Sequence, residues 1–176
     1  VEGFRGIAGK ARLGFRPGPG LTLVVGRNGS GKSSFAEAAE LALTGTASRW
    51  ERRSKVWEEG WACLHLHGPR SIEVKLLAEG QAGETVVRRR WGPTDGLAGG
   101  TAVAQAPGAA EVALEELGVD RALKTWRPFL SYNELGGLLD DGPSRLYDAI
   151  SAVLGLEEWV IAEDRLNDAR KKIEGT

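Results

Sequence analysis

The most specific chemical pattern in the sequence lies at residues 26–34, which read GRNGSGKSS. Gly26, Gly31, Lys32 and Ser33 fit the spacing G-x-x-x-x-G-K-[ST]. Glycines in such a loop let successive backbone N–H groups turn inward around phosphate oxygens, while the lysine reaches the β- and γ-phosphates and the adjacent hydroxyl ligates Mg²⁺. The loop therefore predicts a site for ATP and Mg²⁺, with Lys32 acting on the reacting phosphates.

The predicted nucleotide contacts extend along the whole loop. Ser33 is also the predicted magnesium ligand, and Ser34 is expected to donate to an α-phosphate oxygen. A helix that begins near Lys32 would point its positive end at the same anion. The alternative is a glycine-rich turn that only caps a helix, and the flanking sequence favours the nucleotide site. The loop residues expected to contact the nucleotide are Arg27, Asn28, Gly29, Ser30, Gly31, Lys32, Ser33 and Ser34.

Two elements must hold this loop: a strand before it and a helix after it. The apolar run at 21–25 predicts the strand, and the helix is predicted from Lys32 to Leu43, ending at Thr44-Gly45. Residues 1–15 predict two further strands joined by a turn. The residues expected on the inner side of the helix are Phe35, Ala38, Ala39 and Ala42.

The rest of the chain predicts an antiparallel meander followed by helices. Alternating segments suggest three strands, at 61–67, 71–77 and 84–91. The stretch 91–108 is rich in Gly, Ala and Pro, which predicts a surface loop. Helical patterns occur at 109–118, 120–126 and 143–156.

The last segment, 157–176, differs from the rest. Its apolar residues recur at alternating spacings of three and four, which is typical of the seam of a coiled coil. A seam this short is equally typical of an ordinary amphipathic helix, so both interpretations stay open. The seam residues are Trp159, Ala162, Leu166, Ala169 and Ile173.

Composition limits the class of protein. The 176 residues fit one domain, 41% of them are hydrophobic, and a formal charge of −1 gives no global signal for polyanion binding. No apolar run is long enough to span a membrane and no signal peptide begins the sequence, so we expect a cytoplasmic protein without a membrane partner. The single cysteine, Cys63, is expected to be a buried strand residue.

Local charge and histidine patterns give weaker signals. Arg49, Arg52, Arg53 and Lys55 cluster with Trp50 and Trp57, and Arg88, Arg89 and Arg90 form a run. Such groups can track a nucleic-acid backbone, but acidic neighbours favour solvated faces, and alternation places the middle arginine of the run on the opposite face of a sheet. His65 and His67 lack partners at metal-ligand spacing, which favours surface or hydrogen-bonded histidines over a zinc site.

Hydrolysis needs more than a phosphate loop. A second carboxylate at a strand end must help to hold Mg²⁺, and another group must polarise the attacking water. The only apolar run that ends in acids is LGGLLDD, with Asp140 and Asp141. Its glycines and the proline that follows favour a loop or helix end, so the site is expected to be incomplete within this chain.

Several segments together resemble the N-terminal lobe of an SMC-type ABC ATPase head, most of all the double-strand-break repair ATPases that partner a nuclease. They are VEGFRGI, LTLVVGRNGSGKSS, EAAELALTG, FLSYNEL and PSRLYDAISAVLGLEEW. The resemblance implies an α/β P-loop NTPase fold over residues 1–156, with a mixed sheet around the helix and an antiparallel β subdomain. It also implies that a coiled-coil helix starts over 157–176.

The resemblance implies roles for further residues. Arg5, in GFRG, matches an arginine that lies against the nucleotide phosphates, although Gly6 replaces the usual serine. Asn28 matches a loop asparagine. Tyr132 stands where the family has a glutamine, and a tyrosine cannot ligate Mg²⁺ as an amide oxygen does. Either Asn133 is the second metal ligand instead, or the loop senses nucleotide weakly, and slow hydrolysis is expected.

The function expected from all of this is an ATP-binding head lobe that uses ATP to dock two heads and acts on DNA ends or chromosomes. Its implied partners are a C-terminal lobe that brings the signature motif, the Walker B acids and the switch histidine, a second head, DNA and a nuclease subunit. In a bacterium it would associate with the nucleoid. Two rivals remain: a self-contained small P-loop kinase or NTPase, and a structural nucleotide-binding module with little turnover.

Overall fold

The structure is a computed structural model, and it describes residues 1–50, 55–65, 67–77, 79–118, 129 and 157–174. The chain forms two compact units, Val1–Asp120 and Arg121–Thr176. The predicted division into residues 1–156 and 157–176 stays a prediction.

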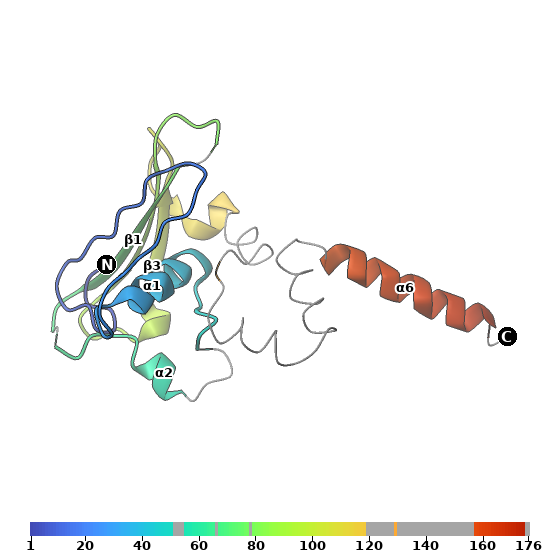
Figure 1. The fold of residues 1–176 in the computed structure, drawn as a ribbon, viewed down its shortest axis with the longest axis horizontal. Coiled ribbons are helices and arrows are strands. Elements are labelled where there is room, and N and C mark those ends of the chain that lie inside the picture. Colours follow the sequence, from blue (N-terminus) through green and yellow to red (C-terminus); the bar gives the residue numbers. More distant parts are fainter. Residues whose placement is uncertain (51–54, 66, 78, 119–128, 130–156, 175–176) are drawn as a thin grey trace. The chain divides into compact units, whose positions relative to one another are not determined.

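The first unit is built from one long helix and a four-stranded antiparallel sheet. The helix α1 (Lys32–Thr44) packs against β1 and β2, as Figure 1 shows. The strand order follows the sequence, β1-β2-β3-β4. The bounds are β1 Arg70–Leu76, β2 Thr85–Trp91, β3 Thr101–Gln105 and β4 Val112–Ala113, with the short helices α2 Val56–Glu59, η1 Leu97–Gly99 and η2 Leu114–Leu117.

The register of the sheet separates an apolar face from a charged one. Val87 lies opposite Val74 on one side and Ala104 on the other, so β-branched and small side chains meet on the face toward α1. The next pair along, Glu73 and Arg88, points to the opposite face because successive strand residues alternate. The sheet is therefore buried on one side only.

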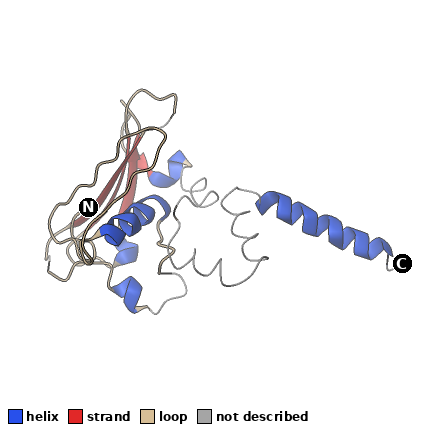
Figure 2. Cartoon of the chain, viewed as in Figure 1, coloured by secondary structure: helices blue, strands red, loops and turns tan. Residues whose placement is uncertain are grey.

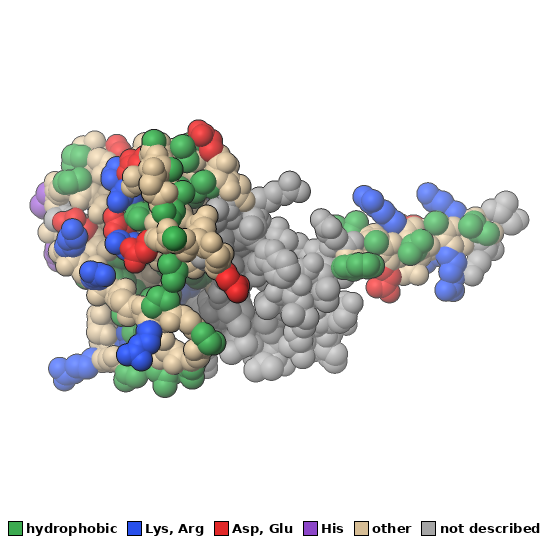
Figure 3. All heavy atoms as spheres, turned by 90° about the horizontal axis from the view of Figure 1, so that it is seen from above, with side chains coloured by type: hydrophobic (Ala, Val, Ile, Leu, Met, Phe, Trp, Pro, Cys, Tyr) green, Lys and Arg blue, Asp and Glu red, His purple; other side chains and the backbone are tan. Residues whose placement is uncertain are grey.

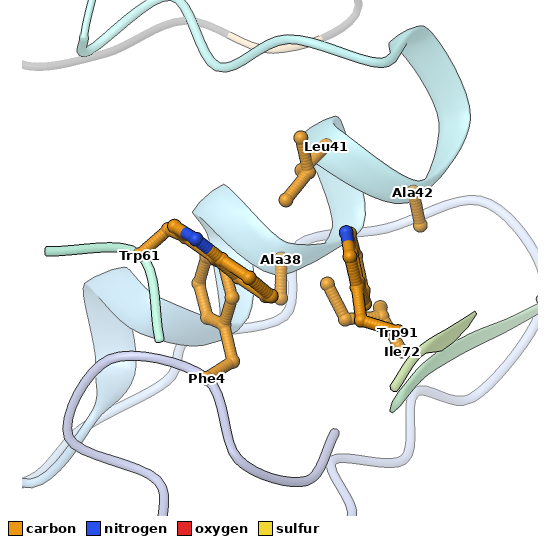
Figure 4. Packing of buried hydrophobic residues seen from close by; sticks show 7 residues of the cluster. All are labelled: Phe4, Ala38, Leu41, Ala42, Trp61, Ile72 and Trp91. Atoms are coloured by element: carbon orange, nitrogen blue, oxygen red, sulfur yellow. The ribbon is translucent and has the colours of Figure 1, made fainter. Parts of the chain in front are cut away.

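Figure 4 shows the core that joins the helix to the sheet. Ala38, Leu41 and Ala42 of α1 point toward aromatic rings and toward a strand residue. The rings of Trp61 and Trp91 lie 4.8 Å apart between their centroids. The buried cluster is Phe4, Ala38, Leu41, Ala42, Trp61, Ile72 and Trp91.

Several predicted elements are confirmed. The helix begins at Lys32 as predicted and ends at Thr44, where Gly45 adopts φ 80° and its N–H bonds Leu41 O. Ala38 and Ala42 are buried as predicted, whereas Phe35 and Ala39 are only half-buried. Strands β1 and β2 pair as predicted from their alternation. Cys63 is buried, and His65 and His67 are exposed.

Other predictions for the middle of the chain are wrong. The predicted surface loop at 91–108 contains β3, because TAVAQ alternates and pairs with β2 over five residues. The predicted helix at 109–118 is replaced by β4 and η2, since Val112 pairs with Ala104. The predicted strand at 61–67 is reduced to one bridge between Ala62 and Phe4.

The segment before α1 also differs from expectation. Residues 1–7 form isolated bridges rather than a strand, and 21–25 form no strand with the described residues. Figure 2 shows this stretch as loop along its course to α1. The sheet of the described residues is wholly antiparallel, so the mixed sheet predicted around the helix is not formed by them. The physical reason is that 21–25 has no neighbouring strand in the described part of the chain.

In the second unit the structure describes the helix α6 (Glu157–Glu174), as predicted for this segment. All five predicted seam residues, Trp159, Ala162, Leu166, Ala169 and Ile173, are exposed. In Figure 3 hydrophobic side chains of α6 lie at the surface beside charged ones. Whether this face forms a coiled coil stays a prediction. Within the described residues, no helix is both long and apolar enough to cross a lipid bilayer.

Candidate functional site

The phosphate loop is shaped by its glycines. Gly29 has φ 80° and Gly31 has φ 85°, in the left-handed region that other residues rarely adopt. Ser30 N donates to Arg27 O over 3.2 Å, which closes a tight turn. A Cβ on Gly26 would lie 2.9 Å from Ser30 Oγ. Each of the three glycines of this loop, Gly26, Gly29 and Gly31, therefore meets a conformational or steric requirement.

The N-terminus of α1 is open to an anion. Gly31 is its N-cap, no side chain caps the helix, and no acidic residue lies in the first turn. The first backbone N–H groups of a helix have no partner within the helix, and the dipole places positive charge there. Residues 26–30 and Ser33 are exposed to solvent. A phosphate group can therefore reach these N–H groups directly.

Lys32 lies inside the curl of the loop. Its Nζ donates to Gly26 O and to Arg27 O, both at 2.7 Å, and lies 3.4 Å from Ser30 Oγ. The loop that is predicted to bind phosphates therefore surrounds the ammonium group. This position brings a positive charge to the same place as the helix N–H groups.

A turn at residues 4–7 supports the loop from the side. Phe4 and Ile7 exchange backbone hydrogen bonds of 3.0 and 2.8 Å. A Cβ added to Gly31 would lie 3.4 Å from Ile7 Cγ1, so this side chain packs directly against the end of the loop. Arg5 lies within the turn at φ 49°, a conformation that costs a non-glycine residue about 1–3 kcal/mol.

Arg5 is held by an acidic residue of α1. Its Nε lies 2.6 Å from Oε2 of Glu37, and its guanidinium lies over the ring of Trp50 at 5.0 Å from the centroid. Glu37 is buried, and its Oε1 also accepts from Arg49 Nη1 at 2.7 Å. Trp50 Nε1 donates to Glu37 Oε2 at 3.0 Å. The predicted role of Arg5 against phosphates stays a prediction.

The sequence pattern of the AAA domain family matches residues 1–101 of this chain. The chain belongs to the AAA domain family.

Individual relatives agree with this assignment. The chain is 26% identical over 160 residues to the DNA double-strand break repair Rad50 ATPase of Methanococcus maripaludis, covering 89% of this chain and 16% of that protein. The same protein of Methanocaldococcus jannaschii matches at 26% over 160 residues, 88% of this chain and 15% of the relative. The DNA replication and repair protein RecF of Magnetococcus marinus is 37% identical over 91 residues, which cover 50% of this chain and 23% of that protein.

These matches confirm the predicted resemblance to double-strand-break repair ATPases. The chain spans only 16% and 15% of the length of the two Rad50 relatives. No solved structure matches the chain. Membership of the AAA domain family implies ATP binding.

The residues of the AAA domain fit magnesium only as a nucleotide complex. Among the described residues, no group of three or more His, Cys, Asp or Glu side chains could hold a metal ion. Mg²⁺ bound with a nucleotide takes most of its ligands from phosphates and water, so one exposed hydroxyl such as that of Ser33 suits it. Asn133, Tyr132, Asp140 and Asp141 lie outside the described residues.

Sequence reasoning missed Glu37 and the cluster around it. The signal was a carboxylate within the alanine-rich inner face of α1, next to the buried Ala38. Its partners could not be found from spacing, since Arg5 and Arg49 come from segments on either side of the loop and helix. Of the basic patch suggested from the sequence, Arg49 and Trp50 contact this carboxylate instead.

The second arginine run is divided between the two faces of the sheet. Arg88 is paired with Glu73 at 2.8 Å and with Glu111 at 2.6 Å, which raises its pKa. Arg89 points toward α1, as the alternation predicted, and burial lowers its pKa. Arg90 lies 3.7 Å from Glu111. The acidic partners leave little unbalanced positive charge on the outer face.

Proposed function

We propose that this chain is the ATP-binding lobe of a DNA repair ATPase head, and that it binds ATP with Mg²⁺ at residues 26–34. The observation that carries the proposal is the exposed phosphate loop, with Lys32 at its centre and the free N-terminus of α1 behind it. A glycine-rich turn that served only as a cap would not need a lysine enclosed by the loop carbonyls.

Each part of the loop has a role in this proposal. Backbone N–H groups at the start of α1 hold the phosphate oxygens, and Lys32 exchanges its bonds to Gly26 O and Arg27 O for bonds to the β- and γ-phosphates. Ser33 holds Mg²⁺, which neutralises charge on the phosphates when it is bound. Asn133 is the proposed second ligand.

We also propose that a C-terminal lobe packs against the apolar run before the phosphate loop. The apolar run before the loop has Leu21 at 85% and Val25 at 89% exposure, and Phe15 and Leu23 are exposed as well. Apolar residues in a strand-like sequence normally pack against a second layer. This exposure supports a partner lobe that packs on the run. Hydrolysis is proposed to require that lobe and a second head.

The biological context is also a proposal. The names of the relatives refer to DNA double-strand break repair and to DNA replication and repair, which supports a role on DNA. A nuclease subunit and cytoplasmic location remain part of the proposal. The exposed seam of α6 supports a coiled coil that starts there.

Two measurements test the proposal. Isothermal titration of the chain with Mg·ATP is expected to show binding that Lys32→Ala weakens by more than about tenfold, since the lysine contacts the most highly charged phosphates. Lys75→Ala is the matched control, because Lys75 pairs with Glu84 on the sheet surface at 2.8 Å. Equal affinity of wild type and Lys32→Ala would refute the site.

Turnover separates the rival classes. If the chain is a head lobe, we expect almost no ATP hydrolysis by the chain alone and ATP hydrolysis after a C-terminal half is added. A self-contained kinase or NTPase requires activity of the chain alone. A structural nucleotide-binding module requires binding without turnover in both conditions.

A further inference from the structure

We infer that Glu37 is a positioning residue for the phosphate loop, acting through Arg5 and the turn at residues 4–7. This inference rests on the proposed nucleotide site. We name the group of Glu37, Arg5, Arg49 and Trp50 the Glu37 clamp. The clamp joins three segments that are separate in the sequence: the N-terminal turn, α1, and the stretch that follows α1.

The chemistry of the clamp requires the carboxylate. The side chain of Glu37 is only 6% exposed, forms an ion pair with Arg5, and accepts hydrogen bonds from the Arg49 guanidinium and from one indole N–H. Two arginines repel each other, and the carboxylate between them offsets this repulsion. A buried carboxylate is stabilised by such charge-assisted bonds, and removing it leaves two cations without their common partner.

The clamp is linked to the loop by direct contacts. Glu37 holds Arg5 in its left-handed conformation, and Arg5 belongs to the turn that Phe4 and Ile7 close. Ile7 packs on Gly31, the last glycine of the loop. A strained conformation persists only where its surroundings hold it, so loss of Glu37 releases the turn and with it the support of Gly31.

The position of Glu37 on the helix brings the clamp close to the proposed site. Ser33 and Glu37 are four residues apart on one face of α1, and helical side chains lean toward the N-terminus. Glu37 and its ion pairs with Arg5 and Arg49 therefore lie about one turn from the proposed metal and phosphate site.

The test compares Glu37→Gln with Glu40→Gln in the full 176-residue chain. Both glutamates lie on α1, and Glu40 accepts from Ser48 N at 2.9 Å, so each variant removes one carboxylate that binds the following segment. Titration with Mg·ATP is made well below the unfolding midpoint of each variant. Glu37→Gln is expected to weaken Mg·ATP binding about tenfold, a size usual for residues coupled in one network, while Glu40→Gln stays within about twofold.

A double-mutant cycle distinguishes positioning from simple stability. Arg5→Ala is expected to weaken Mg·ATP binding to the same extent, and Glu37→Gln is expected to add nothing in the Arg5→Ala background. Additive losses, or unchanged affinity in folded Glu37→Gln, overturn the inference. If Glu37→Gln does not fold, Ile7→Ala tests the same link at its far end, and unchanged affinity there overturns the inference too.

Failure of the proposed function has a different outcome. If wild type and Lys32→Ala both fail to bind Mg·ATP, the nucleotide site itself is wrong and the inference falls with it. If wild type binds and Lys32→Ala does not, the site stands, and the Glu37 variants alone decide the role of the clamp.

Discussion

The antiparallel sheet and the segment that leads into the phosphate loop have similarly apolar sequences, yet they bury these residues to very different extents. Ile72 in β1 and Val87 in β2 are 1% and 0% exposed, whereas Leu21, Leu23 and Val25 are exposed. The sheet strands find their partners through short local connections. The run at 21–25 has no strand partner in the described part of the chain. The comparison teaches that the proposed nucleotide site directly follows a segment whose apolar residues are not buried.

The largest expected effect tests the buried side of this comparison. Ile72→Ala is expected to lower the free energy of unfolding by about 3 kcal/mol, because it removes side-chain contacts from the core and leaves a cavity. Leu23→Ala is the control and is expected to change it by less than about 0.5 kcal/mol. Urea unfolding followed by circular dichroism measures both. Similar losses in the two variants would show that the exposed run is packed in solution.

A glycine between η1 and β3 gives the next effect. A Cβ on Gly100 would lie 2.2 Å from Trp91 Nε1, whose N–H donates to Leu97 O at 2.8 Å. Gly100→Ala is therefore expected to lower the free energy of unfolding by about 2 kcal/mol. Gly96→Ala is a matched control, since Gly96 has φ −74° and no atom within 4 Å of an added Cβ. Equal stability of the two variants in urea unfolding would contradict the close packing.

The exposed side of the comparison is tested by adding the proposed partner. Leu21→Ser and Val25→Ser are each expected to weaken binding of a separately produced C-terminal half about tenfold, or about 1.4 kcal/mol, because they remove apolar contacts with it. Leu77→Ser, at an exposed leucine just after β1, is expected to have little effect. Surface plasmon resonance with the immobilised half measures this. Unchanged binding of both Leu21→Ser and Val25→Ser would contradict a lobe that packs on residues 21–25.

The smallest effect concerns the charged face of the sheet. The hydrogen bond from Arg88 lowers the pKa of Glu73, so the folded state favours the ionised carboxylate. This contribution to stability is present above the ordinary glutamate pKa of about 4.3 and is lost as the pH falls through the lower pKa of the folded state. Because solvent screens the pair, it is expected to be below about 0.5 kcal/mol.

In Glu73→Gln the thermal unfolding midpoint should therefore decrease slightly less than in the wild type as the pH is lowered from neutral to acidic. Near pH 7 the midpoints of the two proteins should differ little. Thermal unfolding recorded over a series of pH values checks this. A steeper acid dependence in the variant than in the wild type would contradict the sign of the pKa shift.

Local patterns allowed much of the fold to be predicted. The glycine spacing and the run of helix-forming residues defined the loop and α1, and alternation defined β1 and β2. The failures came where tertiary pairing decides. Glycine and alanine around TAVAQ concealed β3, although Ala104 is fully buried, and EVALEEL has helix propensity but pairs with β3 at its start.

The loop of the candidate site could be predicted from the sequence, whereas the contacts that support the loop could not. Lys32 and its neighbours follow from a contiguous motif, so sequence alone was enough to propose them. The contact of Ile7 with Gly31 and the ion pair of Arg5 with Glu37 depend on how the chain returns on itself. Spacing contains no information about such contacts, and only the folded chain reveals them.

Trp50 gives the Glu37 clamp an optical readout of its own. Its indole N–H bonds the carboxylate while the Arg5 guanidinium lies over its ring, so the transition that gives fluorescence experiences the field of both charges. A shift of either group is expected to change the emission of Trp50, which is one of six tryptophans in the chain, and Trp50→Phe identifies its share of the signal. Trp50 is thus an intrinsic fluorescent probe of the contact between the N-terminal turn and α1.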